Sequence, residues 1–106
     1  MYHREKEESL LREITAGYFN LHTGTQSIIT ITRCELSRDS KYAKFFISVM
    51  PEDKEAEALN FAKRHRPEIR EYIKDKARLK TLPHVDIEID YGEKNRQRIE
   101  GLINKI

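Results

Sequence analysis

The sequence predicts an α+β fold in which helices cover one face of a β-sheet. Apolar residues recur at helical spacing in four stretches and at strand spacing in three others. The order is helix, strand, strand, helix, helix, strand, helix. All three prolines, Pro51, Pro67 and Pro83, fall at boundaries between these stretches. At 106 residues the chain is long enough for one core, so we expect a single domain over residues 1–106.

The first half of the chain predicts a helix followed by a β-hairpin. Residues 5–21 carry apolar side chains at helical spacing, and their acidic start suits the positive end of the helix dipole. These apolar residues are Leu10, Leu11, Ile14, Tyr18 and Leu21. Residues 28–36 are rich in β-branched side chains, and their apolar positions change phase near Arg33, as a β-bulge there would produce. Residues 41–49 alternate in polarity, so the two strands form a hairpin around the turn residues 37–40.

The next stretch predicts two helices separated by a break at Pro67. Residues 52–66 follow Pro51, which the first turn of a helix tolerates, and their core stripe is Ala58, Leu59 and Ala62. Pro67 removes a backbone donor and disfavours the α conformation for the residue before it. A second helix therefore starts at about Pro67 and runs to about Leu79. It buries Ile69, Tyr72, Ile73 and Ala77.

The C-terminal part predicts a strand and a last helix. Residues 85–91 alternate Val85, Ile87, Ile89 and Tyr91 with three carboxylates, which is typical of a half-buried strand. Residues 93–106 have the spacing of a final helix. The core of the domain is therefore expected over about residues 5–91.

Composition excludes several classes of protein. No stretch approaches the ~20 apolar residues of a membrane span, and the N-terminal residues lack the apolar segment of a secretory signal, so we expect a cytoplasmic protein. The single cysteine, Cys34, excludes an internal disulfide, and with four scattered histidines it predicts neither a metal site nor a cofactor. In its strand context Cys34 is interpreted as a small buried hydrophobe. No His or Asp is spaced to activate it as a nucleophile.

Positive charge is concentrated in one segment. The whole chain is nearly balanced, with 20 basic and 18 acidic residues. Between Lys63 and Lys80, however, eight Lys and Arg residues face only three Asp and Glu residues. This bias favours an anionic partner.

The element order αββααβ is that of a type II KH domain. KH domains grip single-stranded RNA with a Gly-x-x-Gly loop between the two adjacent helices. The glycines of this chain are Gly17, Gly24, Gly92 and Gly101, and His65-Arg66-Pro67 stands at the corresponding break. A KH topology without the glycine loop resembles the ribosome-binding factor A family, and the resemblance extends over roughly residues 5–103.

Three segments carry this resemblance further. Residues 36–39 (Leu-Ser-Arg-Asp) and 42–44 (Tyr-Ala-Lys) are similar to the family's hydrophobic-Ser-x-Asp turn and the strand that follows it. Residues 67–83 resemble the family's helix, which bears an Ile-Arg pair, closes on Arg-Leu-Arg/Lys and reaches a proline before the last strand. Residues 85–90 fit the family's alternating strand that ends in Asp. The chain departs from the family at the break, where His65-Arg66-Pro67 replaces an Ala-x-Gly kink.

The resemblance implies a function without catalysis. A member would bind 16S rRNA in the immature small (30S) ribosomal subunit, near its neck, and assist late maturation and rRNA processing. It would act as a monomer, without a cofactor and away from membranes. Two alternatives stay open: a generic KH-like RNA-binding module, and a protein-interaction module that uses the exposed sheet face or the terminal helix.

The helix after the break supplies the first candidate RNA-binding residues. Arg70, Lys74 and Arg78 are spaced by four, so they are expected to form one basic ridge on which a phosphate backbone can lie. Alternatively the ridge is a solvated face on which Glu71 and Asp75 pair with Lys74 and Arg78. The resemblance favours RNA, and it adds Lys80 just beyond the ridge.

Two further groups of candidates lie elsewhere. Lys63, Arg64 and Arg66 flank the break, where an ordinary KH domain clamps phosphates and the helix N-terminus adds positive charge. His65 is interpreted as a structural, partly exposed histidine. Lys41, Tyr42 and Lys44 form a weaker basic–aromatic group on the second strand of the hairpin.

Two other polar groups have mainly structural interpretations. Asp86, Glu88 and Asp90 alternate on one strand, where a solvent face explains them better than a divalent metal site. His84 stands alone in the sequence and is interpreted as structural or exposed.

Overall fold

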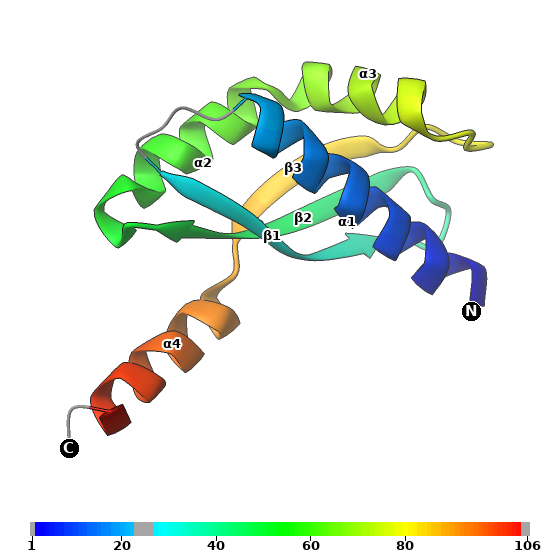
Figure 1. Ribbon diagram of the computed structural model, residues 1–106. Coiled ribbons are helices and arrows are strands. Elements are labelled where there is room, and N and C mark those ends of the chain that lie inside the picture. Colours follow the sequence, from blue (N-terminus) through cyan, green and yellow to red (C-terminus); the bar gives the residue numbers. More distant parts are fainter. Residues whose placement is uncertain (1, 23–26, 105–106) are drawn as a thin grey trace.

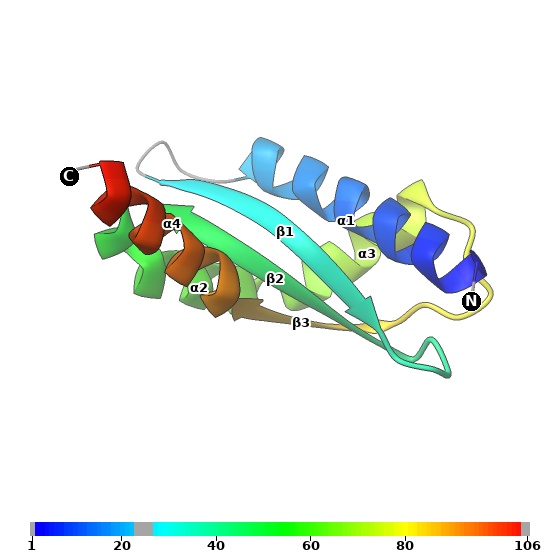
Figure 2. The ribbon, with the colours of Figure 1, turned by 90° about the horizontal axis from the view of Figure 1, so that it is seen from below.

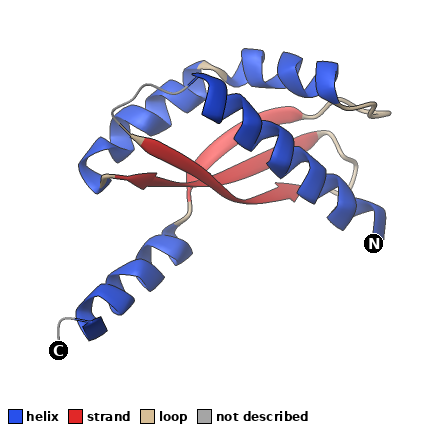
Figure 3. Cartoon of the chain, in the orientation of Figure 1, coloured by secondary structure: helices blue, strands red, loops and turns tan. Residues whose placement is uncertain are grey.

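The computed structural model describes residues 2–22 and 27–104, and its elements follow the predicted order (Figure 1). They are α1 (Tyr2–His22), β1 (Ile28–Leu36), β2 (Tyr42–Met50), the 3-10 turn η1 (Glu52–Lys54), α2 (Glu55–Arg64), α3 (Arg66–Lys76), β3 (His84–Ile89) and α4 (Tyr91–Asn104). The α+β class is confirmed (Figure 3). All three prolines lie at element boundaries, as predicted. No helix within the described ranges combines the length and hydrophobicity needed to cross a bilayer.

The sheet has the strand order β1-β2-β3, with β1 and β2 antiparallel and β2 and β3 parallel. Parallel neighbours require a long crossover, which η1, α2 and α3 provide. The register of β1 against β2 shifts between Ile31 and Arg33, so Thr32 has no residue paired opposite it on β2. This confirms the predicted β-bulge. Because of it, Ile29 before the bulge and Cys34 after it both point into the core.

The core lies between the sheet and three helices. Helices α1, α2 and α3 lie on one side of the sheet, whereas α4 leaves from the other side (Figures 1 and 2). The largest fully buried apolar side chains are Leu11, Phe19, Phe45, Ile47, Ile69, Ile73 and Ile87. Burying each such side chain contributes roughly 1.5–3 kcal/mol. We call the sheet surface opposite the three helices the open face.

Helix α1 buries a different stripe from the predicted one. Leu11 and Tyr18 are buried as expected, but Leu10 is 42% exposed and Leu21 is 69% exposed. Thr15 and Phe19 fill the core instead. A helix advances about 100° per residue, so Leu10 and Leu21 fall outside the face that contains Leu11 and Phe19.

The helix pair differs from prediction at both ends of α3. The break falls at His65 (φ −95°, ψ 11°), and Arg66 is already the first residue of α3, one position earlier than expected. Pro67 lies in the first turn, where its missing N–H removes no helical hydrogen bond. The helix ends at Lys76 rather than Leu79, because Ala77 is extended (φ −133°, ψ 142°) and turns the chain toward β3.

The last strand and helix meet at Asp90 rather than beyond Tyr91. Strand β3 ends at Ile89, so Tyr91 is the first residue of α4 and is 65% exposed, contrary to its predicted place in the strand. The backbone N–H of Glu93 donates to Asp90 Oδ1 at 3.0 Å, as in an N-cap. The predicted helix over residues 93–106 is observed from Tyr91 to Asn104, and residues 105–106 lie outside the described part.

Helix α4 is attached through ion pairs. Lys94 Nζ lies 3.1 Å from carboxylate oxygens of both Glu52 and Glu55, and Arg98 Nη2 lies 2.6 Å from Glu52 Oε1. These contacts tie the first turns of α4 to η1 and α2.

Candidate RNA-binding surface

The predicted ridge on α3 is rearranged because the helix ends early. Arg78 and Lys80 lie in the connection over residues 77–83 rather than on the helix. Residues four apart share one side of a helix, so Arg66, Arg70 and Lys74 lie along the same side of α3. This side faces the connection and β3, because Arg70 contacts the connection and Arg66 contacts β3. We call these three residues, with Arg78 and Lys80, the basic flank.

Arg70 holds the connection against the helix. Its Nε donates to the carbonyl oxygen of Pro83 and its Nη2 to that of Leu82, both at 3.0 Å. The side chain is half-buried. Its planar guanidinium is suited to such paired donation, which fixes where Arg78 and Lys80 lie. Arg70 therefore contributes charge to the flank, but two of its donors are already used within the protein.

Among the other cations of the basic flank, some form an ion pair with a carboxylate and some do not. Arg66 Nη1 lies 3.4 Å from Asp86 Oδ1 on β3, and both side chains are 47% exposed. Such an exposed pair contributes only about 0–1 kcal/mol to stability. Lys74, Arg78 and Lys80 are exposed, and within the described part of the chain no carboxylate lies within ion-pair distance of them. The local pairs of Glu71 and Asp75 with Lys74 and Arg78, which were the alternative to an anionic partner, are therefore not formed.

The break between α2 and α3 is rigidly built. His65 Nδ1 lies 2.7 Å from the carbonyl oxygen of Phe61, which accepts the ring N–H, and the His65 and Phe61 ring centroids are 4.0 Å apart. His65 is half-buried by these contacts. Lys63 and Arg64 occupy the last turn of α2 directly before it, with Arg64 exposed and Lys63 half-buried.

The opposite side of α3 has the opposite charge. A groove of about 350 Å³ between α1 and α3 is lined by two tyrosines, a proline and three carboxylates. They are Tyr18, Tyr72, Pro67, Glu68, Glu71 and Asp75. Tyr18 and Tyr72 meet edge to face with centroids 5.5 Å apart, and Lys76 Nζ lies 5.4 Å from the Tyr72 ring centroid. Burial, and secondarily the Glu68 carboxylate, raises the pKa of Tyr18. We call this the acidic groove.

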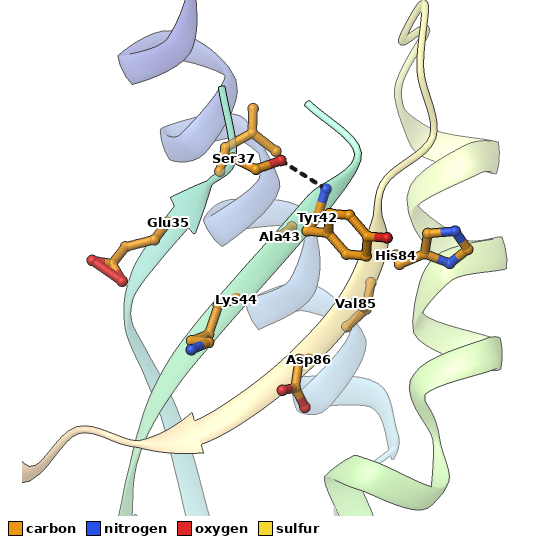
Figure 4. A pocket seen from close by; sticks show the side chains of 9 residues that line it. Glu35, Ser37, Tyr42, Ala43, Lys44, His84, Val85 and Asp86 are labelled. Carbon is orange, nitrogen blue, oxygen red and sulfur yellow. Dashed lines mark hydrogen bonds between the residues drawn. The ribbon is translucent and has the colours of Figure 1, made fainter. Parts of the chain in front are cut away.

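A second aromatic groove lies on the open face, at the end of the sheet near the hairpin turn (Figure 4). Its volume is about 360 Å³. Tyr42 and His84 are partners across the parallel pairing of β2 and β3, and their ring centroids are 5.6 Å apart. Lys44 lies on the same groove and its Nζ is 3.4 Å from Glu88 Oε1. Sequence reasoning named Lys41, Tyr42 and Lys44 but missed His84, because 42 positions separate the two rings in the chain.

The three carboxylates of β3 are each engaged separately. Asp86 faces Arg66, and Glu88 faces Lys44. Asp90 caps α4, accepts the Thr32 hydroxyl at 2.6 Å and lies 3.7 Å from Arg33 Nε. Burial alone would raise the pKa of Asp90, but the hydrogen bonds from Thr32 and Glu93 outweigh it and hold this pKa below its ordinary value. Among the described residues, no three His, Cys, Asp or Glu side chains converge as a metal site would require.

Cys34 is buried, as predicted. Burial, with smaller contributions from the Glu8 and Glu35 carboxylates, raises the pKa of its thiol to about 12. A thiol with such a pKa is protonated at neutral pH and is a poor nucleophile.

The fold and these surfaces define a small α+β protein of αββααβ order, whose paired helices meet without a glycine loop and carry a basic flank. The model of the family described as ribosome-binding factor A matches residues 3–103. The chain belongs to this family.

Individual relatives and solved structures agree with this assignment. The chain is 30% identical to the ribosome-binding factor A of Fervidobacterium nodosum over 76% of this chain and 66% of that protein. It is also 30% identical to that of Clostridium perfringens strain SM101, over 76% of this chain and 71% of that protein. The chain thus spans about two thirds of the length of these relatives.

A crystal structure and a fitted homology model of the factor from Thermus thermophilus have the same fold. The crystal structure of ribosome-binding factor A from this organism superimposes with a TM-score of 0.72 at 16% identity, covering 81% of this chain and 94% of that one. A homology model of the T. thermophilus factor, as fitted into the cryo-EM map of a 30S complex with this factor, gives a TM-score of 0.66 at 16% identity, covering 76% of this chain and 88% of that one.

Proposed function

We propose that this protein binds 16S rRNA in the immature small (30S) ribosomal subunit and assists its late maturation and rRNA processing. Family membership and the T. thermophilus neighbour fitted into a 30S complex support this proposal. The observation that carries it for this chain is the basic flank, on which Lys74, Arg78 and Lys80 are exposed and unpaired among the described residues.

The proposed mechanism is electrostatic docking without bond chemistry. Exposed cations displace counterions from RNA phosphates, and this release supplies much of the binding free energy. A protein that binds one arrangement of the RNA more tightly than another shifts the population toward it. The protein acts in this proposal as a single cytoplasmic domain and a monomer, and not as an enzyme.

The contacts divide the candidate residues into two roles. Lys63, Arg64, Lys74, Arg78 and Lys80 are proposed to contact phosphates directly. Arg66 and Arg70 are proposed to contribute charge while Arg66 pairs with Asp86 and Arg70 positions the connection.

The test is co-sedimentation of the protein with immature and mature small subunits across a salt series. The variant Lys74→Glu/Arg78→Glu/Lys80→Glu reverses three exposed charges without disturbing the core. We expect weaker binding and a shallower dependence on salt, by roughly 0.7–0.9 in the log–log slope for each phosphate that the variant no longer neutralises.

A matched control makes the same change in net charge elsewhere. Arg4, Lys6 and Arg12 lie on α1 and all three are exposed, so Arg4→Glu/Lys6→Glu/Arg12→Glu should bind much more like the wild type. Equal losses of affinity in the two triple variants would contradict a specific basic flank. A wild-type protein that pellets with neither subunit at low salt would rule out the ribosomal function.

A protein-docking role is the second candidate, and one observation favours it. Ile28 and Met50 are cross-strand partners at the far end of the open face and are 69% and 61% exposed. A partner held there would bind with little salt dependence, and Ile28→Ser/Met50→Ser would release it while the flank variant would not.

A further inference from the structure

Tyr42 and His84 form an aromatic platform that the protein itself does not cover. The two rings lie side by side on the open face, with centroids 5.6 Å apart and planes inclined by 34° (Figure 4). Tyr42 is 61% exposed and His84 is exposed as well. A tyrosine that served only to pack would be expected to bury most of its ring.

The hairpin turn holds this platform in place before any ligand arrives. The Tyr42 N–H donates to Ser37 Oγ at 3.0 Å, and the Ser37 N–H donates to the Tyr42 carbonyl at 2.8 Å. The His84 N–H donates to the carbonyl of Lys41 at 2.8 Å, which joins β3 to the same turn. Both rings therefore project from fixed backbone, and binding does not require ordering a loop.

The groove beside the rings suits a flat, uncharged group with polar edges. Its volume of about 360 Å³ lies within the range of roughly 300–1,000 Å³ that small-ligand sites occupy. Glu35, Lys44 and Asp86 stand on its walls as hydrogen-bonding groups. Each has an ion-pair partner, respectively Arg33, Glu88 and Arg66, so the walls are close to neutral.

Exposed positive charge lies next to the platform rather than inside the groove. Arg38 and Lys41 are exposed in and just after the hairpin turn, and neither forms an ion pair among the described residues. The Asp39 carboxylate lies between them and attracts Lys41, while its Oδ1 accepts hydrogen bonds from Ser37 Oγ and the Lys41 N–H. A neutral groove flanked by cations is complementary to a nucleotide, whose base is uncharged and whose phosphates are anionic.

We propose that the Tyr42–His84 platform stacks an unpaired RNA base, while Arg38 and Lys41 contact the adjoining phosphates. This inference rests on the proposed function and adds a second RNA contact on the side of the sheet opposite the helices. Stacking reads the π-face that every base has, so the site accepts a looped-out or terminal nucleotide and not a duplex.

The experiment measures binding of the full-length protein to immature small subunits and to a single-stranded hexaribonucleotide that contains 2-aminopurine. The fluorescence of this base falls when it stacks on an aromatic ring. The variants are Tyr42→Ala and Tyr42→Phe, with Tyr91→Ala as control, because Tyr91 is exposed to a similar degree (65%) on α4.

We expect Tyr42→Ala to weaken binding to both partners by about 5- to 150-fold, the range observed when one stacked base loses its aromatic partner. Quenching of 2-aminopurine should be lost with it. Tyr42→Phe keeps the ring and should stay within about twofold of the wild type, and Tyr91→Ala should leave binding unchanged. The salt slope should hardly change, because no phosphate contact is removed.

The outcomes separate this site from the ribosomal function. If Tyr42→Ala behaves like Tyr91→Ala while the basic-flank variant loses subunit binding, the base site is wrong and the proposed function stands. If the hexanucleotide binds through Tyr42 but subunits do not bind at all, the base site stands and the ribosomal function is wrong. If Tyr42→Ala weakens binding to subunits but not to deproteinised 16S rRNA or the hexanucleotide, the groove docks a protein and the inference is overturned.

Discussion

The two aromatic grooves have nearly the same volume but opposite surroundings. The groove on the open face is built on Tyr42 and His84, whose rings are exposed, and the exposed cations Arg38 and Lys41 lie beside it. In the acidic groove Tyr18 is only 4% exposed, and the carboxylates of Glu68, Glu71 and Asp75 stand on the rim. An aromatic pair is therefore not by itself a ligand site. Ring exposure and nearby charge favour an RNA base in the first groove and disfavour phosphate in the second.

The same contrast runs across helix α3. Arg66, Arg70 and Lys74 lie on the side that faces β3 and the 77–83 connection, while Glu68 and Asp75 line the groove with α1. The net charge of this segment does not show on which side of the helix each charge lies. In the proposed function, this asymmetry would orient the protein on an anionic partner, with Arg66, Arg70 and Lys74 toward it.

The largest expected difference between the two grooves is in stability. Tyr18→Ala removes a ring packed between α1 and α3, and we expect the free energy of unfolding to fall by about 3–4 kcal/mol. Tyr42→Ala removes an exposed ring and should change it by only about 0.5 kcal/mol. Urea denaturation of both variants checks this, and equal shifts of the two midpoints would show that Tyr42 is also a packing residue.

Arg70 tests how much of the basic flank is structural. Arg70→Lys keeps the positive charge but loses the paired donation to the Leu82 and Pro83 carbonyls, so we expect unfolding to become easier by about 1–2 kcal/mol. Affinity for small subunits should fall as well, because the connection that carries Arg78 and Lys80 is no longer fixed. Lys74→Arg is the matched control, and it should leave both quantities unchanged. Full stability in Arg70→Lys would contradict the positioning role.

Neutralising charges around each groove should change RNA affinity in opposite directions. Arg38→Gln/Lys41→Gln is expected to weaken hexanucleotide binding by roughly 3- to 10-fold, since each exposed charge interaction is worth a few tenths of a kcal/mol to about 1 kcal/mol. Glu68→Gln/Glu71→Gln removes repulsion and should tighten binding by roughly twofold or less. Fluorescence titration at low salt measures both, and changes of the same sign would show that location on the surface does not matter.

The smallest expected effect is a pH dependence from Tyr18. Its pKa is raised in the folded protein, so the folded state favours the neutral phenol. This contribution to stability is fully present below the pKa of Tyr18 in the unfolded chain, which is about 10. It is lost as the pH rises through the higher pKa of Tyr18 in the folded protein. Above about pH 10 the stability of the wild type should therefore fall slightly more steeply than that of Tyr18→Phe in parallel urea titrations. Identical slopes would show that folding does not raise the pKa of the Tyr18 hydroxyl.

Local chemistry in the sequence determined most of the elements. Polarity patterns along the chain predicted the hairpin, the helix pair and the last strand. The phase change near Arg33 predicted the bulge at which Thr32 has no cross-strand partner. These features depend on neighbours within a few residues, and side-chain spacing alone records them. The burial of Cys34 followed in the same way, from a small apolar residue in strand context.

Tertiary contacts decided where elements end and which side chains meet. Helix α3 ends at Lys76 where Arg70 binds the carbonyls of Leu82 and Pro83, a contact that becomes possible only once the connection folds back. Tyr42 and His84 meet because β2 and β3 pair in parallel, which requires the whole α2–α3 crossover between them. The sequence by itself thus determined the order of elements and the presence of a basic segment. The separation of charges on α3 also follows from helical spacing, but which side faces β3 and which faces α1 was decided by long-range packing, as was the aromatic platform.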